Sequence, residues 1–161
     1  MAITEGRYGR VTVVTTAAAG EKTVAELGEW RVSGISRDMV DVTVFGNTVK
    51  RMRPATINAG QITFSGFYDP TDSTGQARLI AALSSGKYIG NATLNLKKMR
   101  LWNSDTTSAG STGVYGFWSC SGSSGRVYIT SKDVGTDKNG VGTISFTGQV
   151  SDGLLAWATA T

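Results

Sequence analysis

Histidine is absent from this chain of 161 residues, and its absence removes several kinds of active site. Without histidine there is no Ser-His-Asp triad, no Cys-His dyad and no histidine-based metal site. Neither of the common nucleotide-binding glycine patterns is present, since no G-x-x-x-x-G-K-S/T run occurs and no G-x-G-x-x-G joins a strand-like segment to a helix-like one. The sequence therefore predicts a protein that is not an enzyme and that needs no cofactor or metal.

Cysteine, charge and long apolar runs are also scarce. The single cysteine, Cys120, cannot form an internal disulfide, and its alternating surroundings favour a core thiol in a reducing compartment. No apolar run approaches the roughly 20 residues of a membrane helix. Met1–Glu5 has neither the basic nor the apolar region of a secretory signal. We therefore expect a protein that is made in the cytosol and has no contact with a membrane.

The net charge of +4 is mild, and the basic residues are scattered or form small groups. Two such groups are Lys50, Arg51 and Arg53, and Lys97, Lys98 and Arg100. A dedicated nucleic-acid binder would carry a longer basic stripe. Solvated surface or contact with a protein partner is the favoured interpretation of both groups.

The residues that are abundant favour β structure. There are 21 glycines and only 2 prolines, and charged residues make up 17% of the chain. Few charges among many Thr and Ser residues suit strands whose outer faces meet another protein surface. The length fits one domain, 1–161, with an N-terminal arm at 1–22 that contains a short β-prone run.

Alternation of apolar and polar residues predicts most of the strands. From Thr23 to Phe45, Trp30 and Val32 alternate with polar residues, and a valine alternation follows until Gly46. The polar, basic stretch at 47–59 is expected to be an extended, exposed loop or hairpin tip. The clearest strands are Gln61 to Tyr68 and Thr143 to Val150; further strands are expected at Ala92 to Lys97, Val114 to Cys120 and Arg126 to Thr130.

One helix interrupts the strands. The pair Ser73 and Gln76 fits a capping box, and Gly86 fits the left-handed residue that ends a helix. Between them, apolar residues at helical spacing form a single stripe, which is typical of a helix lying on a sheet. Asp69 and Asp72 are interpreted as residues that favour the helix start, rather than as a glycosidase pair.

Two further groups are compatible with binding. Asp133, Asp137 and Asn139 near a glycine faintly resemble a calcium loop, but they lack its spacing, so a hairpin turn at 137–140 is favoured. The four tryptophans could form a sugar-stacking platform. They are far apart in the sequence, so core or interface anchors are the preferred interpretation; the residues are Trp30, Trp102, Trp118 and Trp157.

Several segments, taken in order, resemble the major tail tube proteins of long-tailed bacteriophages. The resemblance covers roughly residues 23–152. It rests on Thr23–Leu27 before Trp30, on Asp41–Gly46, on Gly60–Asp69 followed by Asp72, Gln76 and Leu79, and on Gly142–Val150. No single segment is specific, whereas their ordered combination is.

This resemblance implies a mostly β (α+β) fold: a β-sandwich or small barrel with one short flanking helix. It also implies hexameric rings that stack into a virion tail tube, assembled in the host bacterial cytoplasm. DNA would pass through the lumen without sequence-specific binding during ejection. The implied partners are further copies of the chain and the tape measure, tail terminator and tail tip proteins.

Within this hypothesis the polar faces of the two clearest strands line the lumen, while Ile62, Phe64, Ile144 and Phe146 lie in the core. The lumen-facing residues would be Gln61, Thr63, Ser65, Thr143, Ser145, Thr147 and Gln149. The exposed loop would reach the adjacent ring through Asn47, Lys50, Arg51, Arg53 and Pro54.

Other classes remain open at this point. The tube protein of a type VI secretion or contractile injection system would share the fold. A virion decoration protein or a carbohydrate-binding β-sandwich is a more distant alternative.

Overall fold

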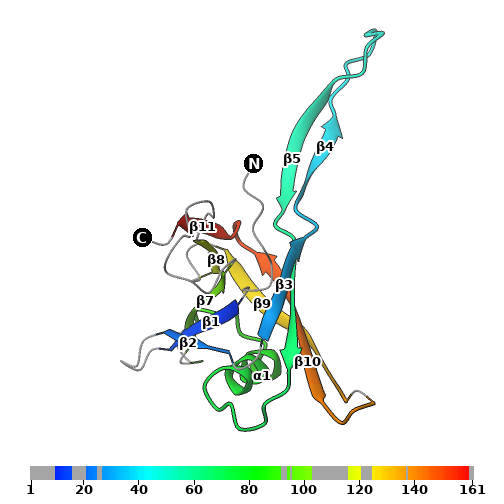
Figure 1. The fold of residues 1–161 in the computed structure, drawn as a ribbon. Coiled ribbons are helices and arrows are strands. Elements are labelled where there is room, and N and C mark those ends of the chain that lie inside the picture. Colours follow the sequence, from blue (N-terminus) through cyan, green and yellow to red (C-terminus); the bar gives the residue numbers. More distant parts are fainter. Residues whose placement is uncertain are drawn as a thin grey trace, which may run out of the picture.

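The structure is a computed structural model, and it describes residues 10–15, 21–24, 27–91, 94, 96–102, 116–120, 125–136 and 138–159. Two β-sheets and a projecting hairpin make up this part of the chain (Figure 1). The five-stranded sheet has the order β11 (Ala156–Thr159), β8 (Gly116–Cys120), β7 (Leu96–Trp102), β1 (Arg10–Thr15) and β2 (Glu21–Thr23). The four-stranded sheet has the order β3 (Leu27–Ser33), β6 (Gln61–Phe67), β10 (Gly142–Ser151) and β9 (Arg126–Thr136).

The two sheets pack face to face as an open sandwich, and the described strands are not closed into the small barrel that was the alternative expectation. Every strand pair in the four-stranded sheet is antiparallel. Alternation along β6 and β10 sends one set of side chains inward, including Phe64 and Phe146, whose rings stack at 5.4 Å between centroids. The expected core residues Ile62, Phe64, Ile144 and Phe146 are each no more than 1% exposed.

A part-buried hydrogen bond ties the two sheets together. The indole Nε1 of Trp30 on β3 donates to the carbonyl oxygen of Trp102 on β7 at 2.7 Å. The Nε1 of Trp102 donates in turn to Oγ1 of the buried Thr12 on β1 at 2.8 Å. Both indole donors are thus satisfied, as burial requires.

The helix α1 (Gln76–Ser85) begins one turn later than Ser73 and uses a different cap. The carboxylate of Asp72 accepts hydrogen bonds from the backbone N–H groups of Gly75 at 2.7 Å and Gln76 at 2.8 Å. The side chain of Gln76 instead turns back to β6, donating to the carbonyl of Phe67 and accepting from the N–H of Asp69. The predicted capping box is therefore wrong. The predicted role at the helix start is confirmed for Asp72, whereas Asp69 accepts from Thr71 in the turn before the helix.

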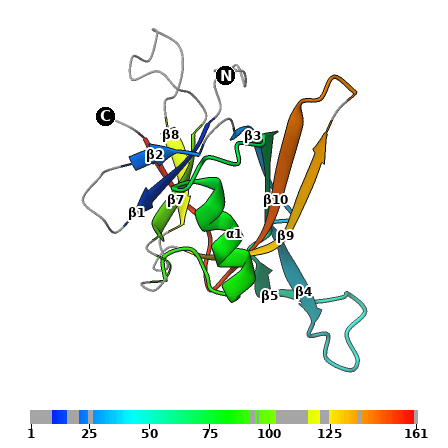
Figure 2. The ribbon, with the colours of Figure 1, turned by 90° about the horizontal axis from the view of Figure 1, so that it is seen from below.

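The end of the helix is as predicted, because Gly86 takes a left-handed φ of 64°. Leu79 and Ala82 are fully buried in the same cluster as the residues between the sheets. The helix lies at one end of the sandwich, beside β9 (Figure 2). It therefore supports the four-stranded sheet from the side opposite to its polar face.

Several predicted boundaries differ from those observed. Arg10–Thr15, assigned to the N-terminal arm, is a central strand whose Val11 and Val13 are fully buried. In the segment 47–59, expected to be an exposed loop or a hairpin tip, the first part lies at the tip of a hairpin, and the second part contributes strand β5 (Met52–Asn58), which pairs with β4 (Ser36–Asp41). Of the strand predicted at Ala92 to Lys97, Leu96 and Lys97 belong to β7, whereas Ala92, Thr93 and Asn95 lie outside the described residues. The predicted 137–140 turn does join β9 to β10, and Gly140 has a φ of 81°. Asp137 and residues 1–9 of the predicted N-terminal arm lie outside the described residues.

Candidate assembly surface

The four-stranded sheet has one face that no other helix or strand of the described residues covers. The register pairs Gln149 with Gln61, Thr147 with Thr63, and Ser145 with Ser65 across β10 and β6. Since facing residues in an antiparallel pair point to the same side, the predicted residues lie together on one surface, which we call the polar face. It carries all seven of them: Gln61, Thr63, Ser65, Thr143, Ser145, Thr147 and Gln149.

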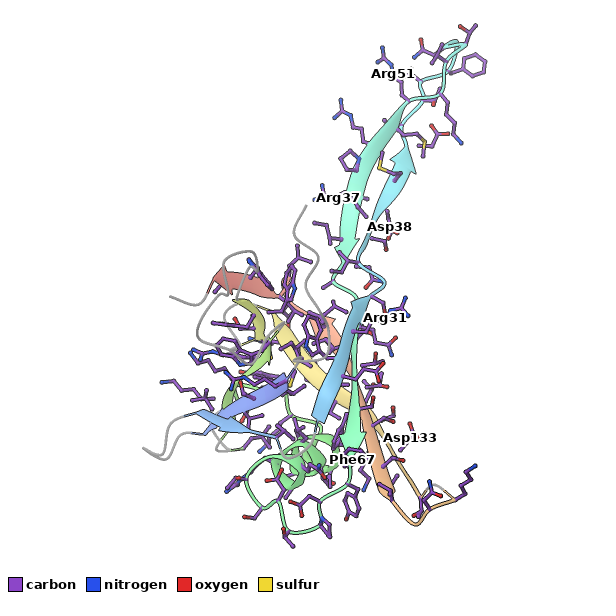
Figure 3. All side chains as sticks on the ribbon, in the orientation of Figure 1. Arg31, Arg37, Asp38, Arg51, Phe67 and Asp133 are labelled. Carbon is purple, nitrogen blue, oxygen red and sulfur yellow. The ribbon has the colours of Figure 1, made fainter. Side chains whose placement is uncertain are left out.

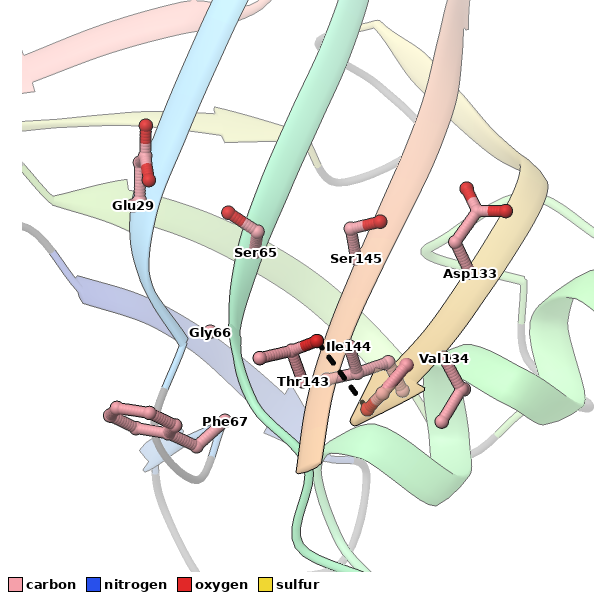
Figure 4. Close-up of a pocket in the computed structure, with 10 residues that line it drawn as sticks. Glu29, Ser65, Gly66, Phe67, Asp133, Val134, Thr143, Ile144 and Ser145 are labelled. Atoms are coloured by element: carbon pink, nitrogen blue, oxygen red, sulfur yellow. Dashed lines mark hydrogen bonds between the residues drawn. The ribbon is translucent and has the colours of Figure 1, made fainter. Parts of the chain in front are cut away.

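The outer strands β3 and β9 extend the polar face on both sides. A row of side chains crosses the sheet from Glu29 through Ser65 and Ser145 to Asp133 (Figure 4). The next row begins with Arg31 on β3. It continues through Thr63 and Thr147 to Ser131 on β9.

These flanking residues were not among the predicted site residues. The alternation of Trp30 and Val32 already indicated that Arg31 and Ser33 face away from the core. No comparable signal marked the second half of β9, where the run Ser131–Thr136 is exposed throughout and carries no apolar alternation.

The polar face is not free of charge. Glu29, Arg31 and Asp133 are all exposed on it. Arg31 and Asp133 lie near opposite edges of the sheet and point to the same side (Figure 3). Among the described residues, none of the three forms an ion pair within this chain. The charged residues of the polar face therefore lie on its outer strands, and the residues that its two central strands contribute are uncharged.

The two ends of the polar face are less simple than its middle. Phe67 faces Thr143 and is 51% exposed, so an aromatic ring ends the face near α1. At the other end, Nε2 of Gln149 donates to the carbonyl of Gly60 at 2.9 Å, which ties this side chain to the turn before β6.

The hairpin of β4 and β5 is a second exposed surface, and it projects from the body beyond the end of β3 (Figure 1). Its strands are exposed along almost their whole length. We call residues 36–58 the arm. It carries unusually many exposed apolar side chains, among them Val44, Phe45 and Val49, of which Phe45 is fully exposed.

The tip of the arm is held by local hydrogen bonds. The carboxylate Oδ1 of Asp41 accepts from the N–H of Thr43 at 2.9 Å, and Oγ1 of Thr43 accepts from the N–H of Arg51 at 2.8 Å. The hydroxyl of Thr43 and its N–H both donate to Asp41, and these two bonds hold the pKa of Asp41 below its usual value. Lys50 approaches the same carboxylate at 3.5 Å. The tip is thus ordered by its own contacts.

The predicted inter-ring residues all lie on the arm, in two settings. Asn47, Lys50 and Arg51 are at its tip, between the strands. Arg53 and Pro54 belong to β5; Pro54 faces Met39, where the register of the pair shifts, so the missing N–H of proline falls at an irregular point of the ladder.

The tryptophans lie in pairs within the sandwich rather than on one platform. Trp118 and Trp157 face each other across β8 and β11, with ring centroids 5.4 Å apart. Trp30 and Trp118 pack against the core, Trp102 is 5% exposed, and Trp157 is 41% exposed. This arrangement agrees with anchors of the fold.

The remaining candidate groups are structural. Burial raises the pKa of the Cys120 thiol to about 12. In the described part of the chain, no group of three or more His, Cys, Asp or Glu side chains is arranged to hold a metal ion. The described helix is too short and too polar to cross a bilayer.

No protein-family model and no curated protein sequence matches the chain. Several solved structures, however, do match the chain. The tail of an empty gene transfer agent (GTA) particle with C6 symmetry is 16% identical, with 99% of this chain and 100% of that chain covered and a TM-score of 0.60. The SPP1 tail tube is 15% identical, with 99% and 82% covered and a TM-score of 0.63.

A third similar structure comes from a contractile system. The sheath/tube terminator of the extracellular contractile injection system PVC is 14% identical, with 94% of each chain covered and a TM-score of 0.61. The shared architecture extends over nearly the whole of this chain in all three cases. The chain therefore has the fold of phage tail tube proteins and of the tube components of contractile injection systems.

Proposed function

We propose that this protein is a structural tail tube protein, in which six copies form a ring and rings stack around a lumen. The observation that carries the proposal is the four-stranded sheet itself. It has a core on one side, a polar face on the other that no described element covers, and two outermost strands, β3 and β9. A sheet of this kind is completed by further copies of itself, because exposed edges otherwise favour uncontrolled aggregation.

The direction of the edge strands supports a closed ring. Strands alternate in direction across β3, β6, β10 and β9, so β3 and β9 run antiparallel to each other. The β3 edge of one copy placed beside the β9 edge of the next then forms an ordinary antiparallel pair. This contact joins two different surfaces, and a head-to-tail contact of this kind forms a ring when the rotation from copy to copy closes.

Such a ring would place the polar face toward the lumen. Six four-stranded sheets make a barrel wider than the porins, whose barrels of about 16–18 strands already leave an aqueous channel. The central strands offer mainly hydroxyl and amide groups there, with Glu29, Arg31 and Asp133 beside them. A wall with so few cations would let DNA pass without holding its phosphates.

The arm supports stacking. It leaves the body along the direction of β3, so it would point from one ring toward the next (Figure 3). Many of its apolar side chains are exposed to solvent. Clusters of exposed apolar side chains are typical of surfaces that another protein covers, and here the cover would be the next ring. The predicted inter-ring residues Asn47, Lys50, Arg51, Arg53 and Pro54 would make contacts there.

Negative-stain electron microscopy of the purified protein tests the proposal. Rings of sixfold symmetry, or tubes built from them, are the expected result. A protein that stays monomeric over a wide range of concentration and salt would contradict it.

The tube of a contractile or type VI secretion system is the second candidate, because the PVC terminator matches as well as the phage tubes do. Tape measure, terminator and tip proteins would be the partners in the virion. Pull-down of these components from phage-infected cells would separate the two settings.

A further inference from the structure

We infer that neighbouring copies in the ring are held in one register by an ion pair across their seam, with Arg31 of one copy opposite Asp133 of the next. This inference rests on the proposed ring, and it names the residues that would fix its geometry. It concerns the contact between β3 of one copy and β9 of its neighbour.

Both edges have free backbone groups where the seam would form. Among the described residues, β3 makes backbone hydrogen bonds only to β6. On β9, the N–H of Ile89 donates to the carbonyl of Val127 at 2.8 Å, so the first part of this edge is already occupied. The second part, Ser131–Thr136, is exposed and available to pair with another strand.

Side-chain direction restricts the possible registers. A shift by one residue would place core-facing side chains beside polar-face side chains, so only even shifts keep the two faces continuous. In the register without a shift, which we call the level register, the row from Glu29 to Asp133 continues straight into the neighbouring copy. Asp133 of one copy would then lie beside Glu29 of the next. Two like charges directly opposite each other are destabilising.

A shift of two residues changes this contact from repulsion to attraction. Asp133 then lies opposite Arg31, Glu29 lies opposite Gly135, and Ser33 lies opposite Ser131. A shift of two in the other sense would carry Asp133 past Glu29 to the bulge of β3 between Leu27 and Glu29, where no charged partner from β3 lies opposite it. Because Arg31 and Asp133 are exposed and form no ion pair with any described residue of their own chain, both can form this one.

The core-facing side of the seam points to the same register. Trp30 faces Phe64, and Val134 faces Ile144, so both lie on the core side of the sheet. Val134 is nevertheless 51% exposed in one copy. The shift that pairs the charges also sets Val134 beside Trp30, a favourable aromatic and β-branched pair, whereas the level register would set Lys132 there.

A charge exchange tests the pair in the full-length protein. Arg31→Asp and Asp133→Arg, made singly, each place like charges across the seam and should raise the protein concentration for half-maximal ring formation at least about tenfold, since the contact recurs around the ring. The double variant should return to within about threefold of the wild type, because exchanged charges attract equally. Circular dichroism of each variant establishes that the monomer is folded.

The outcomes separate the two proposals. Wild-type protein that never forms rings would overturn the proposed function and this register with it. Wild-type rings combined with a double variant no better than the single ones would overturn the register alone.

Disulfide trapping gives a readout that does not depend on altered charges. Ser33→Cys with Ser131→Cys should cross-link copies into a ladder up to the hexamer under oxidation. Within one chain the two positions lie on opposite edges of the sheet, roughly 14 Å apart across three strand spacings. That separation exceeds the limit of about 7 Å between Cα atoms that a disulfide can bridge.

The matched control is Glu29→Cys with Asp133→Cys, which reports the level register. A ladder from the Ser33 and Ser131 pair, with little from the control, supports the inference. A ladder from the control pair alone contradicts it.

Discussion

Asp72 stabilises the first turn of the helix with both of its carboxylate oxygens, which accept hydrogen bonds from the backbone N–H groups of Gly75 and Gln76. Gly75 is needed at this point, because a side chain there would collide with Asp72 and Val24. The turn therefore depends on one acceptor and one close backbone approach.

Asp72→Ala should lower the free energy of unfolding by about 1 kcal/mol, since it leaves these N–H groups without their acceptor. Ser73→Ala should change it by less than about 0.5 kcal/mol, because Ser73 does not cap the helix. Urea denaturation of both variants measures the difference. Equal losses would restore Ser73 as the cap.

The thiol of Cys120 is buried, and burial raises its pKa from 9.0 to about 12. Because the folded-state pKa lies above the unfolded value, the thiol favours the folded state below pH 9, and this contribution is lost as the pH rises from 9 toward 12. Cys120→Ala should therefore reduce the steepness of the alkaline loss of stability. Denaturation curves at several pH values between 8 and 11 measure it, and an unchanged slope would contradict the buried, neutral thiol.

At the scale of residues, alternation identified which side chains of β6 and β10 face the core and which face out. That success has a physical cause, because one face of each strand is buried and the other is not. The choice between Asp72 and Ser73 could not be made in this way. Both are good capping residues, and only the path of Gln76 back to β6 decides between them.

At the scale of elements, the arm (residues 36–58) shows where apolar alternation no longer predicts a strand. β5 carries no apolar alternation because neither of its faces is buried in one copy, so its sequence resembles that of a loop. Its partner β4 is exposed to the same degree. The pairing of the two strands is therefore visible only in three dimensions.

Shortening the arm tests its role as an element. Replacing residues 43–50 with an Asn-Gly turn keeps both strands paired and removes the apolar tip. We expect folded protein that still forms single rings and no longer forms long tubes, as seen by electron microscopy. Tubes of normal length from this variant would exclude the tip from stacking.

A control on the same element separates the tip from the strands. Arg37→Ala and Asp38→Ala alter exposed positions near the base of the arm and leave its tip intact. Each should stack as the wild type does.

At the scale of the whole molecule, the order of the strands was beyond the sequence. β11 and β2 are short edge strands of the five-stranded sheet, and neither was predicted. Their places are set by pairing with β8 and β1 rather than by a pattern of their own. The choice of an open sandwich over a small barrel likewise depends on contacts between distant segments.

One variant copy should be able to prevent a ring from closing, because each copy must make contacts through both of its edges, β3 and β9. Val134→Lys places a charge on the core-facing side of the β9 edge, and a charge at such a position blocks strand pairing. The monomer should remain folded, because Val134 is exposed in it. In a mixture with one variant copy in five, only about a quarter of sixfold rings would contain wild-type copies alone. Counting rings in micrographs against the mixing ratio measures this loss.

Ser84→Lys is the matched control, since it adds the same charge on the exposed side of α1. A simple proportional loss of rings with Val134→Lys would show that each copy assembles independently of its neighbours.

The arm leaves the body at one end only, beyond β3, and the opposite end of the same sheet carries the β9–β10 turn instead. A stack of such rings is a filament with direction. One terminus would display a crown of free arms, and the other would display the bare surfaces that receive them. A factor that starts the tube and a factor that stops it must then recognise different chemistry, and neither can replace the other.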